Sequence, residues 1–223
     1  MCGRFTRYYS WAQVHDYLSL LGTPLNLEPK YNVAPTTEIE VAVADDGARH
    51  MQTMRWGLLP PWAKDLAFGS KTFNARGETV AEKPSFRSAF KSRRCLVPVS
   101  GFYEWKRSGD SKTPFHITLP DSEIMVFAGL WEENTRLADE AIQSFTIVTC
   151  EPNPFMADIH SRMPVILEPE QFELWLDPES EPEQVQELIG PYEGAMQADE
   201  VDRKVGNVRN KGPELIEPVS GSK

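Results

Sequence analysis

The stretch RCLVPVSGFYEW, residues 94–105, is an apolar run rich in β-branched and aromatic side chains. Five runs of the same kind surround it: EIEVAVAD (38–45), ARHMQTMRWGLL (48–59), TPFHITL (113–119), IMVFAGLW (124–131) and SFTIVTC (144–150). Gly, Pro, Asp or Ser bounds each run, and the spacing leaves too little room for a helix between each pair. The pattern predicts an α+β fold with central antiparallel or mixed, twisted, barrel-like β-sheets rather than a doubly wound parallel sheet.

A few helices should flank these sheets. Residues 10–22 read as an amphipathic helix with Ser10 as N-cap and Gly22 as its end, and further helices are expected within 80–92, 168–177 and 182–190. A length of 223 residues fits one domain over 1–223. The Gly-, Asn- and Pro-rich residues 205–223 should form an irregular segment packed on that domain.

Composition narrows the class of protein. The three cysteines, Cys2, Cys95 and Cys150, have no CxxC spacing, so we expect neither a disulfide framework nor a metal site, and no cofactor. The sequence contains no run of about eighteen apolar residues, the length that a membrane-spanning helix requires. We therefore expect a soluble, cytoplasmic protein without membrane association, and a monomer.

Net charge at first argues against nucleic acid, because 23 basic and 33 acidic residues give −10. The charges are unevenly distributed. Residues 1–116 hold 16 Lys and Arg against 11 Asp and Glu, whereas residues 117–223 hold 7 against 22. A local anion-binding groove in the N-terminal half therefore remains compatible with the negative total.

Cys2 follows the initiator methionine directly, in MCGRF. Removal of Met1 would place a thiol and a free α-amine, with a reference pKa of about 7.7–8.0, on one residue. Such an aminothiol condenses with an aldehyde to a Schiff base and then closes a thiazolidine ring, which no internal cysteine can do. Alternatively, Cys2 is an unimportant frayed end, or its thiolate attacks an acyl carbon as in cysteine hydrolases.

Three other stretches carry candidate chemistry. In FNARGET (73–79), Asn74 and Arg76 alternate and would share one face of a strand, although a loop Asn and a surface Arg are the ordinary interpretation. Glu104 lies between aromatic neighbours, where desolvation would suit it to proton transfer, although an exposed strand glutamate would look the same. His160 and Arg162 alternate in a punctuated loop, where a histidine is a candidate general acid or a purely structural residue.

Taken in order, these stretches resemble one family. The matching motifs cover essentially the whole chain: MCGRF (1–5), YNVAP (31–35), WGLLPPW (56–62), FNARGET (73–79), RCLVPVSGFYEW (94–105), PFHI (114–117), FAGLW (127–131), TIVTCEPN (146–153), IHSRMPVIL (159–167) and VGNVRNKGPELIEPV (205–219). They are similar to the SRAP family (SOS-response-associated peptidase), the abasic-site-processing proteins.

The resemblance implies a DNA-damage function. Cys2, freed of Met1, would form a thiazolidine crosslink with the aldehyde of an abasic site in single-stranded DNA and so shield the lesion. Asn74 would position the α-amine and the sugar, Glu104 would move protons during Schiff-base formation, and His160 would act at the sugar hydroxyl. The resemblance also implies crosslink reversal, lyase-like activity, an N-terminal autopeptidase step and a link to the SOS response.

The resemblance implies binding residues as well. Arg4, Arg76 and Arg162 match positions near phosphates, and Pro35, Trp62 and Trp105 match apolar platforms for bases. Cations and stacking rings suit a single strand, with about 1–3 kcal/mol for each stacked base. Two alternatives stay open: a cysteine hydrolase or peptidase that acts on other proteins, with His160 as base, and a single-stranded DNA-binding module without a covalent step.

Overall fold

The computed structural model describes residues 2–219; Met1, whose removal the sequence interpretation requires, and residues 220–223 of the expected C-terminal segment lie outside the described part. Eight strands form the larger sheet: β3 (Glu38–Asp45), β4 (Ala48–Trp56), β5 (Asn74–Arg76), β6 (Arg94–Val99), β9 (Met125–Asn134), β10 (Ile142–Cys150), β11 (Met163–Pro164) and β12 (Ile166–Leu167). Five strands form the smaller sheet: β1 (Phe5–Arg7), β2 (Lys30–Val33), β7 (Gly101–Ser108), β8 (Ser111–Thr118) and β13 (Gln197–Glu200).

The larger sheet closes on itself. Its strands pair in the order β10–β4–β3–β6–β9, and β9 pairs again with β10, which completes a ring of five strands. Strand β10 runs parallel to β4 and to β5 and antiparallel to β9, so the sheet is mixed. The alternation expected from the sequence turns Ile39 and Val41 inward, where they are at most 1% exposed. These findings confirm the α+β class with barrel-like mixed sheets.

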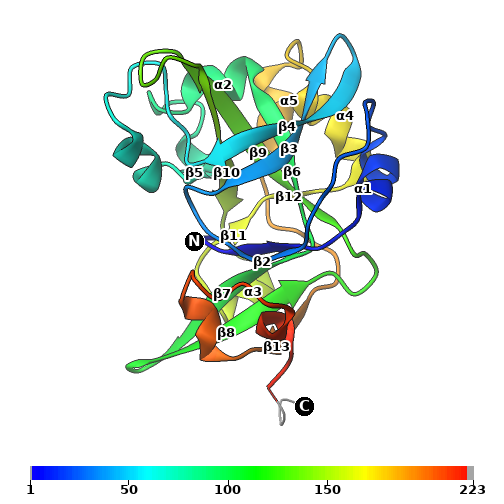
Figure 1. Ribbon diagram of the computed structural model, residues 1–223, viewed down its shortest axis with the longest axis vertical. Coiled ribbons are helices and arrows are strands. Elements are labelled where there is room, and N and C mark those ends of the chain that lie inside the picture. Colours follow the sequence, from blue (N-terminus) through cyan, green and yellow to red (C-terminus); the bar gives the residue numbers. More distant parts are fainter. Residues whose placement is uncertain (1, 220–223) are drawn as a thin grey trace.

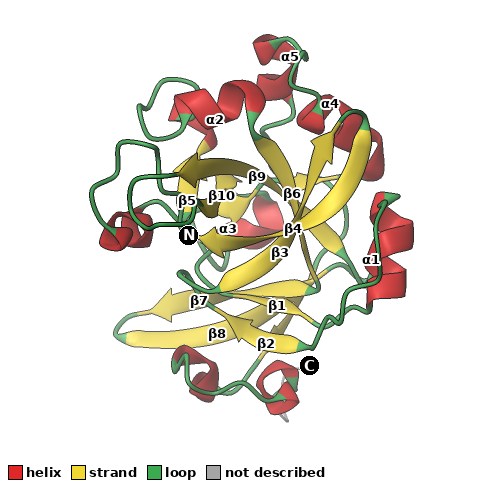
Figure 2. Ribbon diagram, turned by 45° about the horizontal axis from the view of Figure 1, so that its top comes forward, coloured by secondary structure: helices red, strands yellow, loops and turns green. Residues whose placement is uncertain are grey.

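The smaller sheet lies below the barrel as Figure 1 and Figure 2 are drawn, and the stretch 94–105 connects the two. That stretch is two strands rather than one continuous run, because the chain turns at Ser100. The Ser100 N–H donates to the Thr6 carbonyl (2.8 Å), and the Ser100 Oγ accepts from the Tyr8 N–H (3.0 Å). The next residue must be small, because a Cβ on Gly101 would lie 2.5 Å from Nε2 of His116.

Short helices cover the barrel. Helix α1 (Trp11–Leu18) begins at the expected N-cap, where Ser10 and Gln13 form a capping box, but it ends at Ser19, which adopts a left-handed φ of 51°, and not at Gly22. The other helices are shorter than their expected ranges or were not expected: α2 (Arg87–Ser92), α3 (Pro154–Ala157), α4 (Phe172–Leu176) and α5 (Pro182–Glu187). Within residues 2–219, no helix is long and apolar enough to cross a membrane.

The C-terminal segment lies along the smaller sheet, beside β7 and β8 in Figure 1. It contains two short 3-10 turns, Arg203–Gly206 and Pro213–Ile216, and is otherwise irregular. Val205 and Leu215 are fully buried and pack against Tyr103 of β7 in a small apolar cluster, separate from the barrel core. The segment therefore completes the outer side of the sheet from which Glu104 and Trp105 also come.

Candidate functional site

Cys2 lies just ahead of β1, between the barrel and the smaller sheet, and its side chain is fully buried. Strand β5 runs parallel to β10 with Asn74 opposite Ile147, and this register brings the Asn74 side chain to the start of the described chain. Asn74 Nδ2 donates to the Cys2 carbonyl oxygen (2.8 Å). Asn74 Oδ1 is buried and accepts no hydrogen bond from any atom of residues 2–219. This amide therefore fixes Cys2 through its donor and leaves its acceptor oxygen unused within residues 2–219.

Glu104 connects Cys2 with His160. The Glu104 carboxylate projects from β7, is 4% exposed, and its Oε2 lies 3.9 Å from Nε2 of His160. Burial, followed by the negative charge of Glu104, raises the pKa of the Cys2 thiol. Glu104 thus acts electrostatically on the cysteine and contacts the histidine, which gives the three side chains one shared site.

The loop that carries His160 is held at both ends. The His160 N–H donates to the Met156 carbonyl at the end of α3 (2.8 Å), and Asn153 caps that helix. At the other end, the Arg162 N–H donates to Nδ1 of His160 (3.1 Å), while the Arg162 carbonyl lies 3.2 Å from the same nitrogen. Nδ1 of His160 can therefore accept from the Arg162 N–H or donate to the Arg162 carbonyl, depending on the tautomer, while Nε2 faces Glu104.

The Arg162 guanidinium is already bound within the protein. Both of its terminal nitrogens bond the Glu78 carboxylate, and Nη2 also donates to the Thr149 carbonyl (2.6 Å). Hydrogen bonding from Arg162 lowers the pKa of Glu78. A phosphate expected at Arg162 would have to compete with this fork-shaped pair.

Arg4 is also engaged, on the side of the C-terminal segment. Its Nη1 donates to Asn32 Oδ1 (2.7 Å) and to the Val205 carbonyl (2.8 Å), and its guanidinium lies 5.8 Å from the centre of the Trp105 ring. Asn32 is 1% exposed and donates from Nδ2 toward the carbonyls of Val205, Asn207 and Asn210. Arg4 and Asn32 therefore tie the C-terminal segment to β1 and β2.

A cleft of about 360 Å³ opens beside this cluster. Its lining residues come from β7, β8, the His160 loop and the C-terminal segment: Glu104, Trp105, Arg107, Lys112, His160 and Gly206. The half-buried Trp105 ring and the Glu104–His160 pair thus share one open space. An aromatic wall can hold a planar group, and the neighbouring carboxylate and imidazole are side-chain types that can transfer protons.

The other residues predicted to bind DNA lie outside this cluster or are exposed to solvent. Arg76 follows Asn74 on β5 and is exposed. Trp62 is 47% exposed, with its ring edge-on to Phe68 at 5.0 Å, and the half-buried Pro35 follows β2. None of the interactions described for residues 2–219 joins Trp62 or Pro35 to the cluster around Cys2.

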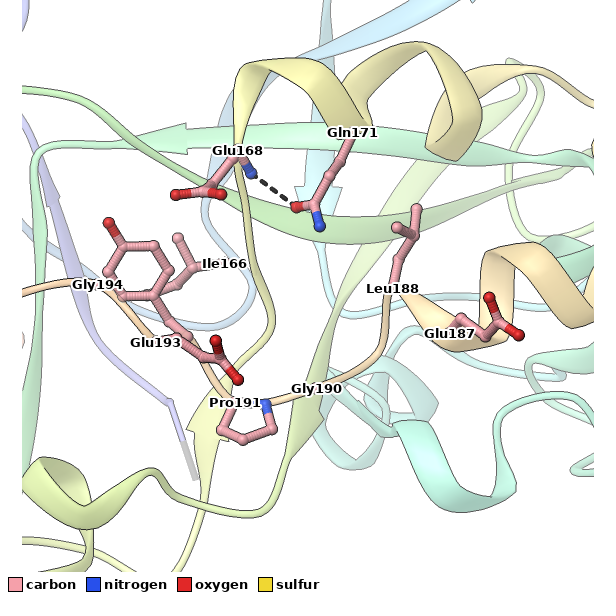
Figure 3. Close-up of a pocket in the computed structure, with 10 residues that line it drawn as sticks. Ile166, Glu168, Gln171, Glu187, Leu188, Gly190, Pro191, Glu193 and Gly194 are labelled. Atoms are coloured by element: carbon pink, nitrogen blue, oxygen red, sulfur yellow. Dashed lines mark hydrogen bonds between the residues drawn. The ribbon is translucent and has the colours of Figure 1, made fainter.

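A second cleft, of about 300 Å³, is shown in Figure 3. It lies between the turn that begins at Glu168 and the segment around Pro191, and Glu187 and Glu193 also line it. Its three carboxylates make it unsuitable for a polyanion. Among residues 2–219, no group of three or more His, Cys, Asp or Glu side chains could hold a metal ion.

Sequence reasoning missed two organising residues. Glu78 holds Arg162, and Asn32 holds the C-terminal segment, yet the motifs FNARGET and YNVAP that contain them indicate no such role for either residue. The spacing of Asn74, Arg76 and Glu78 was the available signal for the first. For the second, only the structure reveals that a residue near position 32 meets residues near 205–210.

Comparisons with known proteins match residues 1–208 to the family described as SOS response associated peptidase (SRAP). The abasic site processing protein YoqW of Bacillus subtilis is 41% identical over 222 residues, which cover 97% of this chain and 99% of that protein. The abasic site processing protein YedK of Escherichia coli is 34% identical, with 98% and 100% covered. A crystal structure of a protein from Bacteroides thetaiotaomicron superimposes with a TM-score of 0.86 at 25% identity, with 98% and 100% covered.

Proposed function

The chain belongs to the SRAP family, and on that premise we propose that it processes abasic sites in DNA by capturing them covalently through Cys2. The substrate is an abasic site in a single strand, and the product is a thiazolidine crosslink that shields the lesion. Capture requires prior removal of Met1, because only then does Cys2 carry a free α-amine. The relatives YoqW and YedK, both named abasic site processing proteins, support the substrate class.

One observation carries the proposal: Cys2 is held by Asn74 on one side and lies under the influence of the buried Glu104, which contacts His160. Nucleophilic capture of an aldehyde needs a fixed amine, a base to deprotonate it and an acid to release water. In this proposal Asn74 fixes the amine, and Glu104 and His160 act as base and acid. The buried Oδ1 of Asn74, which accepts no hydrogen bond within residues 2–219, is the proposed acceptor for the α-amine.

The proposed reaction proceeds in two steps. His160 donates a proton to the ring oxygen as the sugar ring opens and takes up the proton of the sugar hydroxyl, which leaves the aldehyde. The Cys2 α-amine then attacks the aldehyde carbon, so that a C–N bond forms. Glu104 carries one amine proton to the carbonyl oxygen, which becomes a hydroxyl, and then carries the second amine proton to that hydroxyl as it departs. One water leaves with formation of the Schiff base. The thiol then adds across the C=N bond, with sulfur on carbon and its proton on nitrogen, and no further atom is lost.

The thiol environment speaks against the hydrolase alternative. Cysteine hydrolases rely on a thiolate, which is favoured where neighbouring cations lower the thiol pKa. Here, burial and Glu104 raise the pKa of Cys2. A protonated thiol suits a sequence in which the amine reacts first and the sulfur adds only after the Schiff base has formed.

Binding of the strand is proposed to be tolerant of sequence. Trp105 presents a half-buried ring in the cleft, and the exposed Trp62 is available to a base farther along the strand. Arg76 is exposed on the same short strand as Asn74 and can neutralise a nearby phosphate. Stacking and phosphate contacts together predict binding that weakens with salt.

The test is the intact mass of the protein after incubation with a single-stranded oligonucleotide that carries one abasic site. We expect a species equal to the Met1-free protein plus the oligonucleotide minus one water. Cys2→Ser keeps the α-amine but lacks the thiol, so it should give only a Schiff base that needs borohydride for trapping. Glu104→Gln should slow adduct formation by about 10²-fold or more, as expected for lost acid/base catalysis.

A tetrahydrofuran oligonucleotide, which lacks the aldehyde, serves as the control and should give no adduct. A stable adduct of Cys2→Ser equal to that of the wild type would refute thiazolidine formation. Absence of any adduct from verified Met1-free protein that still binds the oligonucleotide would leave the non-covalent binding module as the explanation.

A further inference from the structure

Two cations that the sequence did not single out line the same cleft as the Glu104–His160 pair. Arg107 and Lys112 stand directly opposite each other in the β7–β8 hairpin, and both are exposed. Arg107 alternates with Trp105 along β7, so these two side chains leave the same face of the hairpin. The cleft thus combines an aromatic wall with two positive charges beside it.

These cations are available, in contrast to two of the arginines expected at phosphates. Within residues 2–219, no carboxylate lies within 4 Å of Arg107 or Lys112 and no side-chain hydrogen bond engages them. Arg162 is held by Glu78, and Arg4 donates to Asn32 and the Val205 carbonyl. The cations that remain available to a phosphate in the cleft are therefore Arg107 and Lys112 on the hairpin.

The backbone at this edge supports the same ligand. Strand β1 pairs with β7 only at Phe102 and Gly101, and the next contact is the Tyr103 N–H, which donates to the Arg4 carbonyl (2.9 Å). Because N–H groups alternate between the two edges of a strand, those of Trp105 and Arg107 point to the same side as that of Tyr103. Backbone N–H groups beside Arg and Lys are a common way to bind a phosphate.

We propose that Arg107 and Lys112 form a phosphate clamp for one phosphodiester next to the abasic nucleotide. The inference deepens the proposed function and rests on it, because the clamp would align the strand so that its sugar reaches Glu104 and His160. The ligand is a backbone phosphate of a single strand, read without regard to base. Arg107 and Lys112 are therefore positioning and binding residues with no part in the proton transfers.

The experiment measures binding apart from chemistry. A fluorescent single strand with a tetrahydrofuran site, which cannot crosslink, is titrated with wild-type protein and with the double variant Arg107→Gln/Lys112→Gln over a series of salt concentrations. Each phosphate contact on a single strand contributes about 0.7 to the slope of log K against log salt, and the clamp holds one phosphodiester, so the double variant should lose about 0.7. The control, Arg87→Gln/Lys91→Gln, removes two exposed cations on α2 and should keep the wild-type slope.

Crosslinking with abasic DNA supplies the second readout. The double variant should need more DNA for half-maximal crosslinking and should keep the wild-type rate at saturation, because the acid/base pair is intact. An unchanged salt slope in the double variant, with the wild type binding normally, would overturn the clamp and leave the proposed function standing. A wild type that formed no salt-sensitive complex with the strand would overturn both.

Discussion

Replacing Asn32 by alanine removes the side chain that ties the C-terminal segment to the smaller sheet. Its two Nδ2 hydrogens serve three backbone carbonyls at 2.9–3.2 Å, so about two neutral hydrogen bonds are lost at any time. Its Oδ1 accepts from Arg4 at 2.7 Å, which is a third, charge-assisted bond. Neutral bonds contribute about 1 kcal/mol each and charge-assisted ones about 1.5–3 kcal/mol.

Part of this loss is recovered. The Val205 carbonyl still accepts from Arg4, and water can reach the carbonyls that lie near the surface. We therefore expect Asn32→Ala to lower the free energy of unfolding by about 3 kcal/mol. For a chain of this size, that corresponds to a fall in Tm of about 6–12 °C.

The assay is urea unfolding followed by circular dichroism, with Asn207→Ala as control because Asn207 is exposed in the same segment. The control should lose less than about 1 kcal/mol, as surface substitutions usually do. Proteolysis of native protein should also cut Asn32→Ala faster within residues 205–219. A loss below about 1 kcal/mol for Asn32→Ala, or no difference from the control, would refute the assignment of Asn32 as the anchor.

Two further stability predictions concern buried ionisable side chains. Arg93→Ala should lower the free energy of unfolding in urea by about 3–5 kcal/mol, because it leaves the buried Glu132 carboxylate without its cation. That carboxylate is 4% exposed and accepts from Arg93 at 2.7 and 3.1 Å. A loss below about 1 kcal/mol would contradict this reasoning. Burial lowers the pKa of His116 from 6.5 to about 4. Between these pH values the unfolded chain therefore binds more protons than the folded chain. The free energy of unfolding should fall by up to about 3 kcal/mol as the pH drops from 6.5 to 4. His116→Gln should flatten that dependence, and an equally steep profile in the variant would show that other groups cause it.

Much of the fold was predictable because its signals are local. The period-two runs gave the strands of the barrel, and Ser10 with Gln13 gave the start of α1. The turn at Ser100 was not predictable, because it depends on Thr6 and His116, which meet it only after the smaller sheet has formed. Within the expected helical range 80–92, only Arg87–Ser92 is α-helix, which agrees with the break or start that Pro84 imposes on a helix.

The candidate site, too, has a part that the sequence predicts and a part that only the fold reveals. Cys2, Asn74, Glu104 and His160 were named from their motifs, and the structure places them in one cluster, while their chemical roles stay predictions. The sequence could not indicate which of these side chains are already bound by other residues of the protein. The engagement of Arg162 by a residue 84 positions away is a property of the folded chain alone.

The closed ring of strands also determines how late in synthesis the barrel can fold. Strand β10 pairs with β4, β5, β9 and β11, so the barrel stays open until residues 142–150 have been synthesised. Until then, β4 has a bare edge, which is a hazard for association between nascent chains. Such distant pairings are slow to form, so a ribosome-bound chain that ends before residue 142 should bind chaperones, and release should follow once β10 has emerged.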